Sequence, residues 1–148
     1  MCISAFRFPK FEFSDKTLTE NSLNVSGDEV LVRLVDKYAY LPVGSANGTF
    51  LARWGMCLKN SKTPLRFCRN ESLESGKWAS FSPTIVEIPV CLALSMGVWF
   101  QVRKAISGVL VENFSGERCV FVLTKPSTHY FEVMTGSKRM PVLINQIL

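Results

Sequence analysis

The residue best suited to covalent chemistry stands at the start of the chain, where Cys2 directly follows Met1. A small residue at position 2 lets aminopeptidases remove the initiator methionine, which would leave the thiol of Cys2 beside a free α-amine. Such an amine has a pKa of about 7.7–8.0, so much of it is neutral and nucleophilic near physiological pH. Either this terminus carries an inert exposed thiol, or it is an active site.

The other residues that could ligate a metal or act as nucleophiles are few. The cysteines are Cys2, Cys57, Cys68, Cys91 and Cys119. Their odd number and the lack of a CxxC pair predict neither a disulfide framework nor a zinc site, and we expect no metal and no cofactor. A thiol hydrolase that pairs Cys2 with His129, the single histidine, has little support, because no spacing links the two.

Basic residues are in excess and give a net charge of +5, which favours polyanionic partners. The densest basic run, with aromatic residues between its members, comprises Lys59, Lys62, Arg66, Arg69 and Lys77 together with Trp54, Phe67 and Trp78. Basic side chains can neutralise phosphates and aromatic rings can stack on unpaired bases, a combination suited to single strands. On composition alone, a solvated loop is the better explanation of the same run.

The elements that must position these residues are predicted to be mostly strands. The 148 residues are 47% hydrophobic and 11% aromatic, which is typical of one compact domain spanning 1–148. The longest apolar stretch, 88–100, contains Pro89, Ser95 and Gly97 and is too short to span a bilayer. With no secretory signal at the N-terminus, we expect a soluble, cytoplasmic protein without a membrane partner.

Runs rich in β-branched and aromatic residues predict strands at 30–35, 49–54, 84–90, 98–102, 108–111 and 119–123. Turn residues at 44–48 and 114–116 predict hairpins between the strands that flank them. One helix is predicted at 127–134, between a Ser/Thr cap and Gly136. The predicted fold class is therefore α+β, mostly β: a single domain of antiparallel strands with few short helices.

Read in order, short segments of the chain resemble the SOS response-associated peptidase (SRAP) family of abasic-site-processing proteins. They are MCISAFRF, Asn24 and Val25, RWGM at 53–56, FCRNES with Arg69 and Glu71, CLALSMGVWFQ with Cys91, Leu92 and Gly97, SGVLVE with Gly108, Leu110 and Glu112, VLTK at 122–125, and SKRMPVLI with Arg139, Met140 and Pro141. Each match is short, but the matches follow the order of the family's motifs and together span nearly the whole chain. The interval between Val102 and Ser107 is much shorter than in the family, so the resemblance is to a compact form of its β fold.

The resemblance implies a chemistry for Cys2. In that family the initiator methionine is removed, and Cys2 reacts with the ring-opened aldehyde of an abasic site in single-stranded DNA. The amine condenses with the aldehyde to an imine, and the adjacent thiol closes a thiazolidine ring. The resemblance thus implies a monomer that crosslinks to DNA, with lyase-like activity and peptidase-like removal of its own Met1 in the context of DNA damage.

The resemblance also assigns supporting residues, some retained and some replaced. Arg69 and Arg139 match arginines that contact DNA phosphates, although Arg139 could equally form a surface salt bridge. The DNA-binding set we predict is Arg69, Arg139, Trp54, Lys62 and Arg66. The family's catalytic Asn, Glu and His fall on Phe67, Phe100 and Ser137, so proton transfer worth about 10²–10⁴-fold would be absent unless another group supplies it. The candidate substitutes are Glu71, Glu112, Ser137 and His129.

Two functional hypotheses follow. The first is a single-stranded DNA-binding protein that senses abasic sites and crosslinks to them through Cys2. The second is a catalytically degenerate member that binds DNA or a protein partner without covalent chemistry, as the two phenylalanines at polar site positions suggest.

Overall fold

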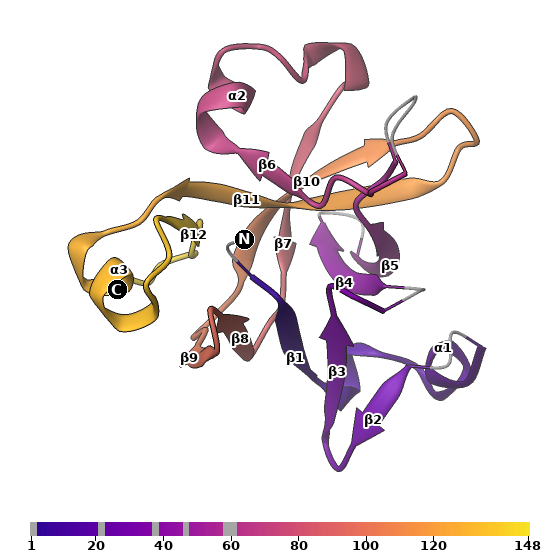
Figure 1. The fold of residues 1–148 in the computed structure, drawn as a ribbon. Helices are drawn as coiled ribbons and strands as arrows, with labels where there is room; N and C mark the ends of the chain where they lie inside the picture. The colour runs from indigo at the N-terminus through magenta and orange to yellow at the C-terminus, as the bar shows by residue number, and fades with distance from the viewer. Residues whose placement is uncertain (1–2, 21–22, 37–38, 46–47, 58–61) are drawn as a thin grey trace.

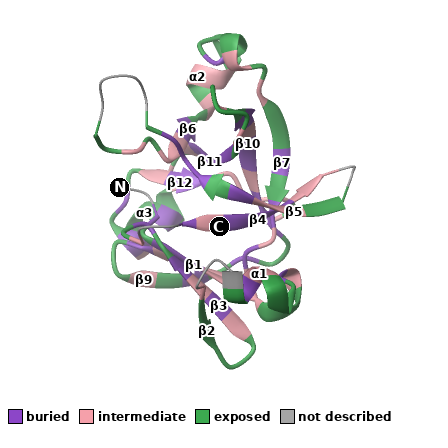
Figure 2. Ribbon diagram, turned by 90° about the vertical axis from the view of Figure 1, so that its right-hand side faces the viewer, coloured by how far each residue is buried: buried purple, intermediate pink, exposed green. Residues whose placement is uncertain are grey.

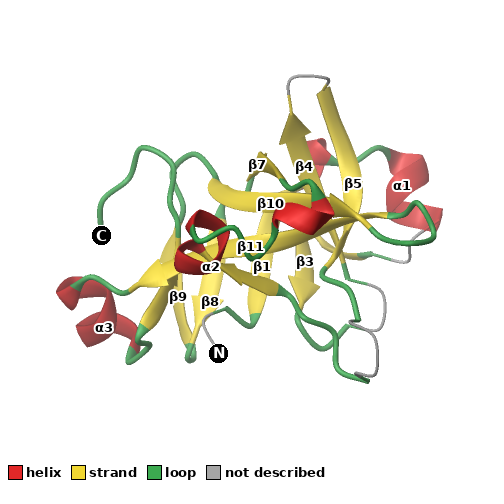
Figure 3. Cartoon of the chain, turned by 90° about the horizontal axis from the view of Figure 1, so that it is seen from above, coloured by secondary structure: helices red, strands yellow, loops and turns green. Residues whose placement is uncertain are grey.

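A computed structural model describes residues 3–20, 23–36, 39–45, 48–57 and 62–148 of the chain. Within these ranges the protein is mostly β, with three short α-helices that lie at the outside of the sheets (Figures 1 and 3). The predicted class, α+β and mostly β with antiparallel strands, is confirmed. None of the helices in the described ranges is long and apolar enough to cross a membrane.

One sheet has the strand order β2-β3-β1-β8-β9. Its strands are β1 (Ala5–Pro9), β2 (Asn24–Ser26), β3 (Glu29–Arg33), β8 (Leu92–Ser95) and β9 (Val98–Gln101). All of its neighbouring strands pair antiparallel. Helix α1 (Asp15–Glu20) and the short 3-10 turn at Lys10–Glu12 connect β1 to β2.

The second sheet has the order β10-β7-β4-β5-β11-β12, and an added β10–β11 pairing closes part of it into a ring. Its strands are β4 (Tyr40–Ser45), β5 (Gly48–Trp54), β6 (Phe67–Arg69), β7 (Thr84–Ile88), β10 (Ile106–Glu112), β11 (Arg118–Pro126) and β12 (Arg139–Pro141). β5 and β6 pair parallel with β11, whereas the hairpins expected around 44–48 and 114–116 pair antiparallel as β4–β5 and β10–β11.

Helix α3 (His129–Thr135) forms where the sequence predicts it, because its end signals are local. Thr128 caps the helix: its side chain accepts a hydrogen bond from the backbone N–H of Phe131. Gly136 ends it with a left-handed φ of 78°. Helix α2 (Asn70–Glu74) directly follows β6 and has no such side-chain cap.

The core lies between the two sheets and along their inner faces, where buried residues concentrate in the strands (Figure 2). The main cluster includes the fully buried rings of Phe6, Phe8 and Trp54. A smaller cluster under α2 is built around Trp78 and Phe121, whose ring centroids are 4.8 Å apart. These two clusters fix β11, which lies across the middle of the molecule with β12 and α3 at one end (Figure 1).

Candidate functional site

Strand β11 brings the two predicted phosphate-contacting arginines together from distant parts of the sequence. On one side, β6 pairs with β11 so that Arg69 lies opposite Thr124. On the other side, β12 pairs with β11 so that Arg139 lies opposite Pro126. Both arginines line one cleft of about 370 Å³, together with Leu65, Phe67, Ser72, Trp78 and Thr124.

Arg139 is firmly held within this cleft. Its Nη1 donates to Glu71 Oε2 at 2.7 Å, and its Nη2 donates to Glu71 Oε1 at 3.2 Å. Nη2 also lies 3.1 Å from both the carbonyl oxygen and Oγ1 of Thr124. The hydrogen bond from Arg139 is the main reason that the pKa of Glu71 is lowered. The structure thus shows Arg139 in the salt bridge that the sequence left open as an alternative.

Unlike Arg139, Arg69 has an exposed side chain, at the end of β6. Among the described residues, none forms a salt bridge with Arg69. Phe67, two residues earlier on the same strand, is half-buried and lies on the cleft wall. The cleft therefore offers one open guanidinium, one guanidinium held by a carboxylate, and an aromatic ring.

Trp54 cannot stack on a base in this conformation, which corrects the expectation that it forms part of a DNA-binding surface. Its side chain is fully buried, and its ring packs against Phe6 and Phe67 with centroid separations of 5.0 and 6.0 Å. Its indole Nε1 donates to the carbonyl oxygen of Arg66 at 3.1 Å. The alternating apolar pattern of β5 turns this residue inward, so Trp54 is part of the core.

Arg66 and Lys62 differ in how freely their side chains could contact a ligand. Arg66 Nη1 donates to the carbonyl oxygen of Trp54 at 2.9 Å, and its guanidinium lies 5.5 Å from the centroid of the Trp54 ring. Burial, followed by repulsion from Arg53, lowers the pKa of Arg66. Lys62 is exposed, and Lys59 lies outside the described residues. Neither Arg66 nor Lys62 lines the cleft.

The three residues that the resemblance matches to catalytic groups, Phe67, Phe100 and Ser137, do not form a proton-transfer site. Phe100 is 5% exposed and packs edge-on against Phe131, with ring centroids 5.2 Å apart. Ser137 is buried, and its Oγ donates to the carbonyl oxygen of Arg139 at 2.7 Å. Phe67 packs against Trp54. Two of the positions are therefore apolar, and the third supports the backbone of β12.

Of the four candidate substitutes, Glu71 and Ser137 contact Arg139. Glu112 pairs in register with Arg118 at the other end of β11 from Thr124. At about 3.3 Å per residue these ends lie roughly 20 Å apart, so Glu112 is remote from the cleft. His129 is exposed at the first residue of α3. Glu71 is thus the carboxylate that the fold brings to Arg139.

The predicted nucleophile Cys2 lies outside the described residues. The chain that follows it is well anchored: Ile3 is fully buried, and the N–H of Ser4 donates to the carbonyl oxygen of Leu94 at 2.9 Å. The thiols of Cys68 and Cys119 are buried, and burial raises the pKa of each to about 11. Neither is a thiolate near neutral pH, as expected for structural cysteines.

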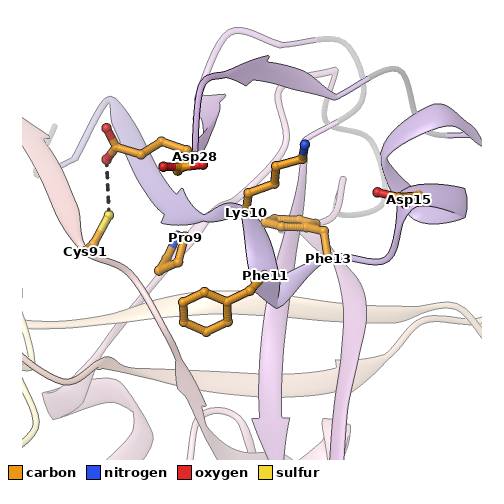
Figure 4. A pocket seen from close by; sticks show the side chains of 8 residues that line it. Pro9, Lys10, Phe11, Phe13, Asp15, Asp28 and Cys91 are labelled. Atoms are coloured by element: carbon orange, nitrogen blue, oxygen red, sulfur yellow. Dashed lines mark hydrogen bonds between the residues drawn. The ribbon is translucent and has the colours of Figure 1, made fainter.

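A second hollow, of about 640 Å³, lies where β1 meets α1 and is lined by Pro9, Lys10, Phe11, Phe13, Asp15, Asp28, Glu29 and Cys91 (Figure 4). Cys91 Sγ lies 3.4 Å from Glu29 Oε2 and 3.1 Å from the carbonyl oxygen of Arg7. Burial and the bond to Glu29 raise the pKa of the Cys91 thiol. The hollow therefore does not contain an activated nucleophile.

Sequence reasoning missed Thr124 and Ser72 as cleft residues, because their neighbours come from tertiary contacts and not from local sequence, whereas Trp78 was part of the basic, aromatic run. Among the described residues, no group of three or more His, Cys, Asp or Glu side chains could hold a metal ion. The chain matches no protein-family model, no curated protein and no solved structure. The resemblance to the abasic-site-processing family rests on the short ordered motifs alone.

Proposed function

We propose that this protein binds single-stranded DNA in the cleft between β6, β11 and β12 and captures abasic sites through Cys2 after removal of Met1. The observation that supports the proposal most is the meeting of Arg69 and Arg139 beside Phe67 in one cleft. These two arginines are the ones that the ordered motifs select as phosphate contacts. We also propose that the protein is cytoplasmic.

The chemistry of the cleft suits a nucleotide strand. A guanidinium presents a planar fork of N–H donors that matches phosphate oxygens, and Arg69 is exposed for such a contact. The half-buried ring of Phe67 offers an apolar surface to a base or a sugar. The volume of about 370 Å³ falls in the range of about 300–1,000 Å³ that is usual for small-molecule and cofactor sites.

The covalent step needs only the two nucleophiles of Cys2 and the open-chain aldehyde of the abasic sugar. The α-amine adds to the aldehyde carbon, and loss of water gives an imine. The thiol then adds to the imine carbon, and its proton passes to the nitrogen, which closes the thiazolidine ring. Since Phe67 and Phe100 cannot transfer protons, we expect this reaction to be slower than an assisted one by about 10²–10⁴-fold.

A second candidate function is binding of DNA without covalent capture, or binding of a protein partner. It is favoured by Phe100, which is closed into the core against Phe131 where the family carries a glutamate. This candidate uses the same cleft as the first, forms no adduct, and includes a protein as an alternative ligand to DNA.

The binding step is tested by titrating a fluorescent oligothymidine with wild-type protein and with Arg69→Gln at several salt concentrations. One lost phosphate contact on a single strand reduces the slope of log K against log salt by about 0.7 and weakens binding about fivefold at 0.1 M salt. Arg103→Gln is the matched control, because Arg103 is exposed and lies outside the cleft. Absence of binding by the wild-type protein, or equal losses in the two variants, would overturn the proposal.

A further inference from the structure

The anion-binding face of Arg139 is already occupied by the protein itself. Glu71 accepts two hydrogen bonds from Arg139, one from Nη1 to Oε2 at 2.7 Å and one from Nη2 to Oε1 at 3.2 Å. This two-pronged arrangement is the same one by which arginine holds a phosphate. A phosphate and the Glu71 carboxylate therefore compete for the same two N–H groups.

The two partners of this salt bridge are held very differently. The Arg139 side chain is 21% exposed, and Thr124 fixes its Nη2 through two oxygen atoms. The Glu71 side chain is 52% exposed on α2, a helix of five residues. Since Glu71 is already largely hydrated, it can turn into solvent at little cost, whereas Arg139 stays in the cleft.

Arg139 also has hydrogen-bonding capacity that the described residues leave unused. Its Nε is buried and has no hydrogen-bond partner. A buried donor without an acceptor is unfavourable, and such exceptions in a native structure call for an explanation. Glu71 and Thr124 therefore do not satisfy the whole guanidinium group in the free protein.

We propose that Glu71 is a built-in counter-ion that occupies the phosphate site of Arg139 in the free protein and is displaced when DNA binds. Arg69, which is exposed, makes the first phosphate contact, and Arg139 makes its contact only after Glu71 leaves. Glu71 thereby limits the affinity of the cleft for polyanions. This inference rests on the proposed function, because it describes the regulation of the same cleft.

The test compares Glu71→Gln with Glu74→Gln, each alone and combined with Arg139→Gln. Glu74 is the matched control because it lies on the same helix, is exposed, and bonds to Asn70 Nδ2 at 3.2 Å rather than to an arginine. Both glutamates are exposed, so we expect every single variant at these positions to fold. Thermal melting checks this directly.

Glu71→Gln is expected to tighten oligothymidine binding about two- to fivefold, the range for breaking an exposed ion pair. Glu74→Gln should have a smaller effect. With Arg139→Gln present, the difference between the two exchanges should vanish, because no site remains for Glu71 to occupy. An equal effect of both exchanges, or a gain from Glu71→Gln that persists without Arg139, would overturn the inference while leaving DNA binding intact.

Inorganic pyrophosphate separates this inference from the proposed function. If neither the wild-type protein nor Glu71→Gln binds oligothymidine, the proposed function fails, and the variants are then compared by the shift in melting temperature that pyrophosphate produces. A larger shift for Glu71→Gln than for Glu74→Gln supports the counter-ion role for anions in general. Equal shifts would contradict it.

Discussion

Phe100 occupies a core position at which a titratable side chain would be unfavourable. Its ring is nearly fully buried and meets Phe131 at 5.2 Å, edge to face. In this position it adds to the core that fixes α3 against β9. A polar group at the same position would have to displace that packing, so the fold favours an apolar side chain at position 100.

We therefore expect Phe100→Glu to destabilise the protein without creating activity. An ionised carboxylate without a partner in the core costs several kcal/mol, and the exchange also removes the contact with Phe131. Urea denaturation measures the loss. The control is Gln101→Glu, which places the same carboxylate one residue later, at an exposed position. Equal stability of the two variants, or faster capture of abasic DNA by Phe100→Glu, would contradict this explanation.

At the scale of elements, the sequence predicts what local signals determine and misses what pairing determines. Helix α3 carries its own cap at Thr128 and its own stop at Gly136, so its prediction is confirmed. Strands β6 and β12 are three residues each and contain no long β-branched run. They are strands because β11 offers hydrogen-bonding partners on both sides.

Gly55 connects β5 to the segment that leads toward the cleft, and its backbone explains why glycine stands there. Its φ is +82°, a left-handed conformation, and an added Cβ would collide with the carbonyl oxygen of Leu65. The N–H of Gly55 donates to the carbonyl oxygen of Val120 at 2.8 Å. A side chain at position 55 would push the segment of Leu65 and Arg66 away from β5 and so disrupt the contact between Arg66 and Trp54.

Gly55→Ala is thus predicted to be much more destabilising than Gly76→Ala. Gly76 has nearly the same φ, +83°, but an added Cβ there meets no atom within 4 Å. Gly76→Ala should therefore show only the conformational cost, about 1–2 kcal/mol. Gly55→Ala adds the steric collision, and thermal melting of both variants gives the difference. Similar melting temperatures would show that the Leu65 segment moves aside freely.

At the scale of the whole molecule, the fold class follows from composition and strand patterns, but the arrangement of the sheets does not. The ring of strands that closes through β10–β11, and the parallel pairing of β5 and β6 with β11, join segments far apart in the chain. The cleft is a product of these long-range pairings. For that reason the sequence could select Arg69 and Arg139 by motif, whereas Thr124 and the bond from Arg139 to Glu71 became evident only in three dimensions.

The position of Trp54 in the fold explains why the sequence wrongly predicts it to be a binding residue. Trp54 stands in a basic, aromatic run that resembles a binding surface, but β5 lies between β4 and β11, where one face is covered by the core. Whether a ring in such a run faces a ligand or the interior depends on which face of the strand is covered. Sequence composition does not contain that information.

The central claim, capture of abasic DNA by Cys2, is tested most directly by intact-mass measurement after incubation with a single strand that carries one abasic site. The predicted product has the mass of the protein without Met1 plus the DNA, less one water, and it survives denaturation. It should be absent with undamaged DNA and with Cys2→Ala, and retained by Cys57→Ala, which removes an exposed thiol elsewhere in the chain. Retention of Met1, no adduct with the wild-type protein, or an unchanged adduct with Cys2→Ala would contradict the claim.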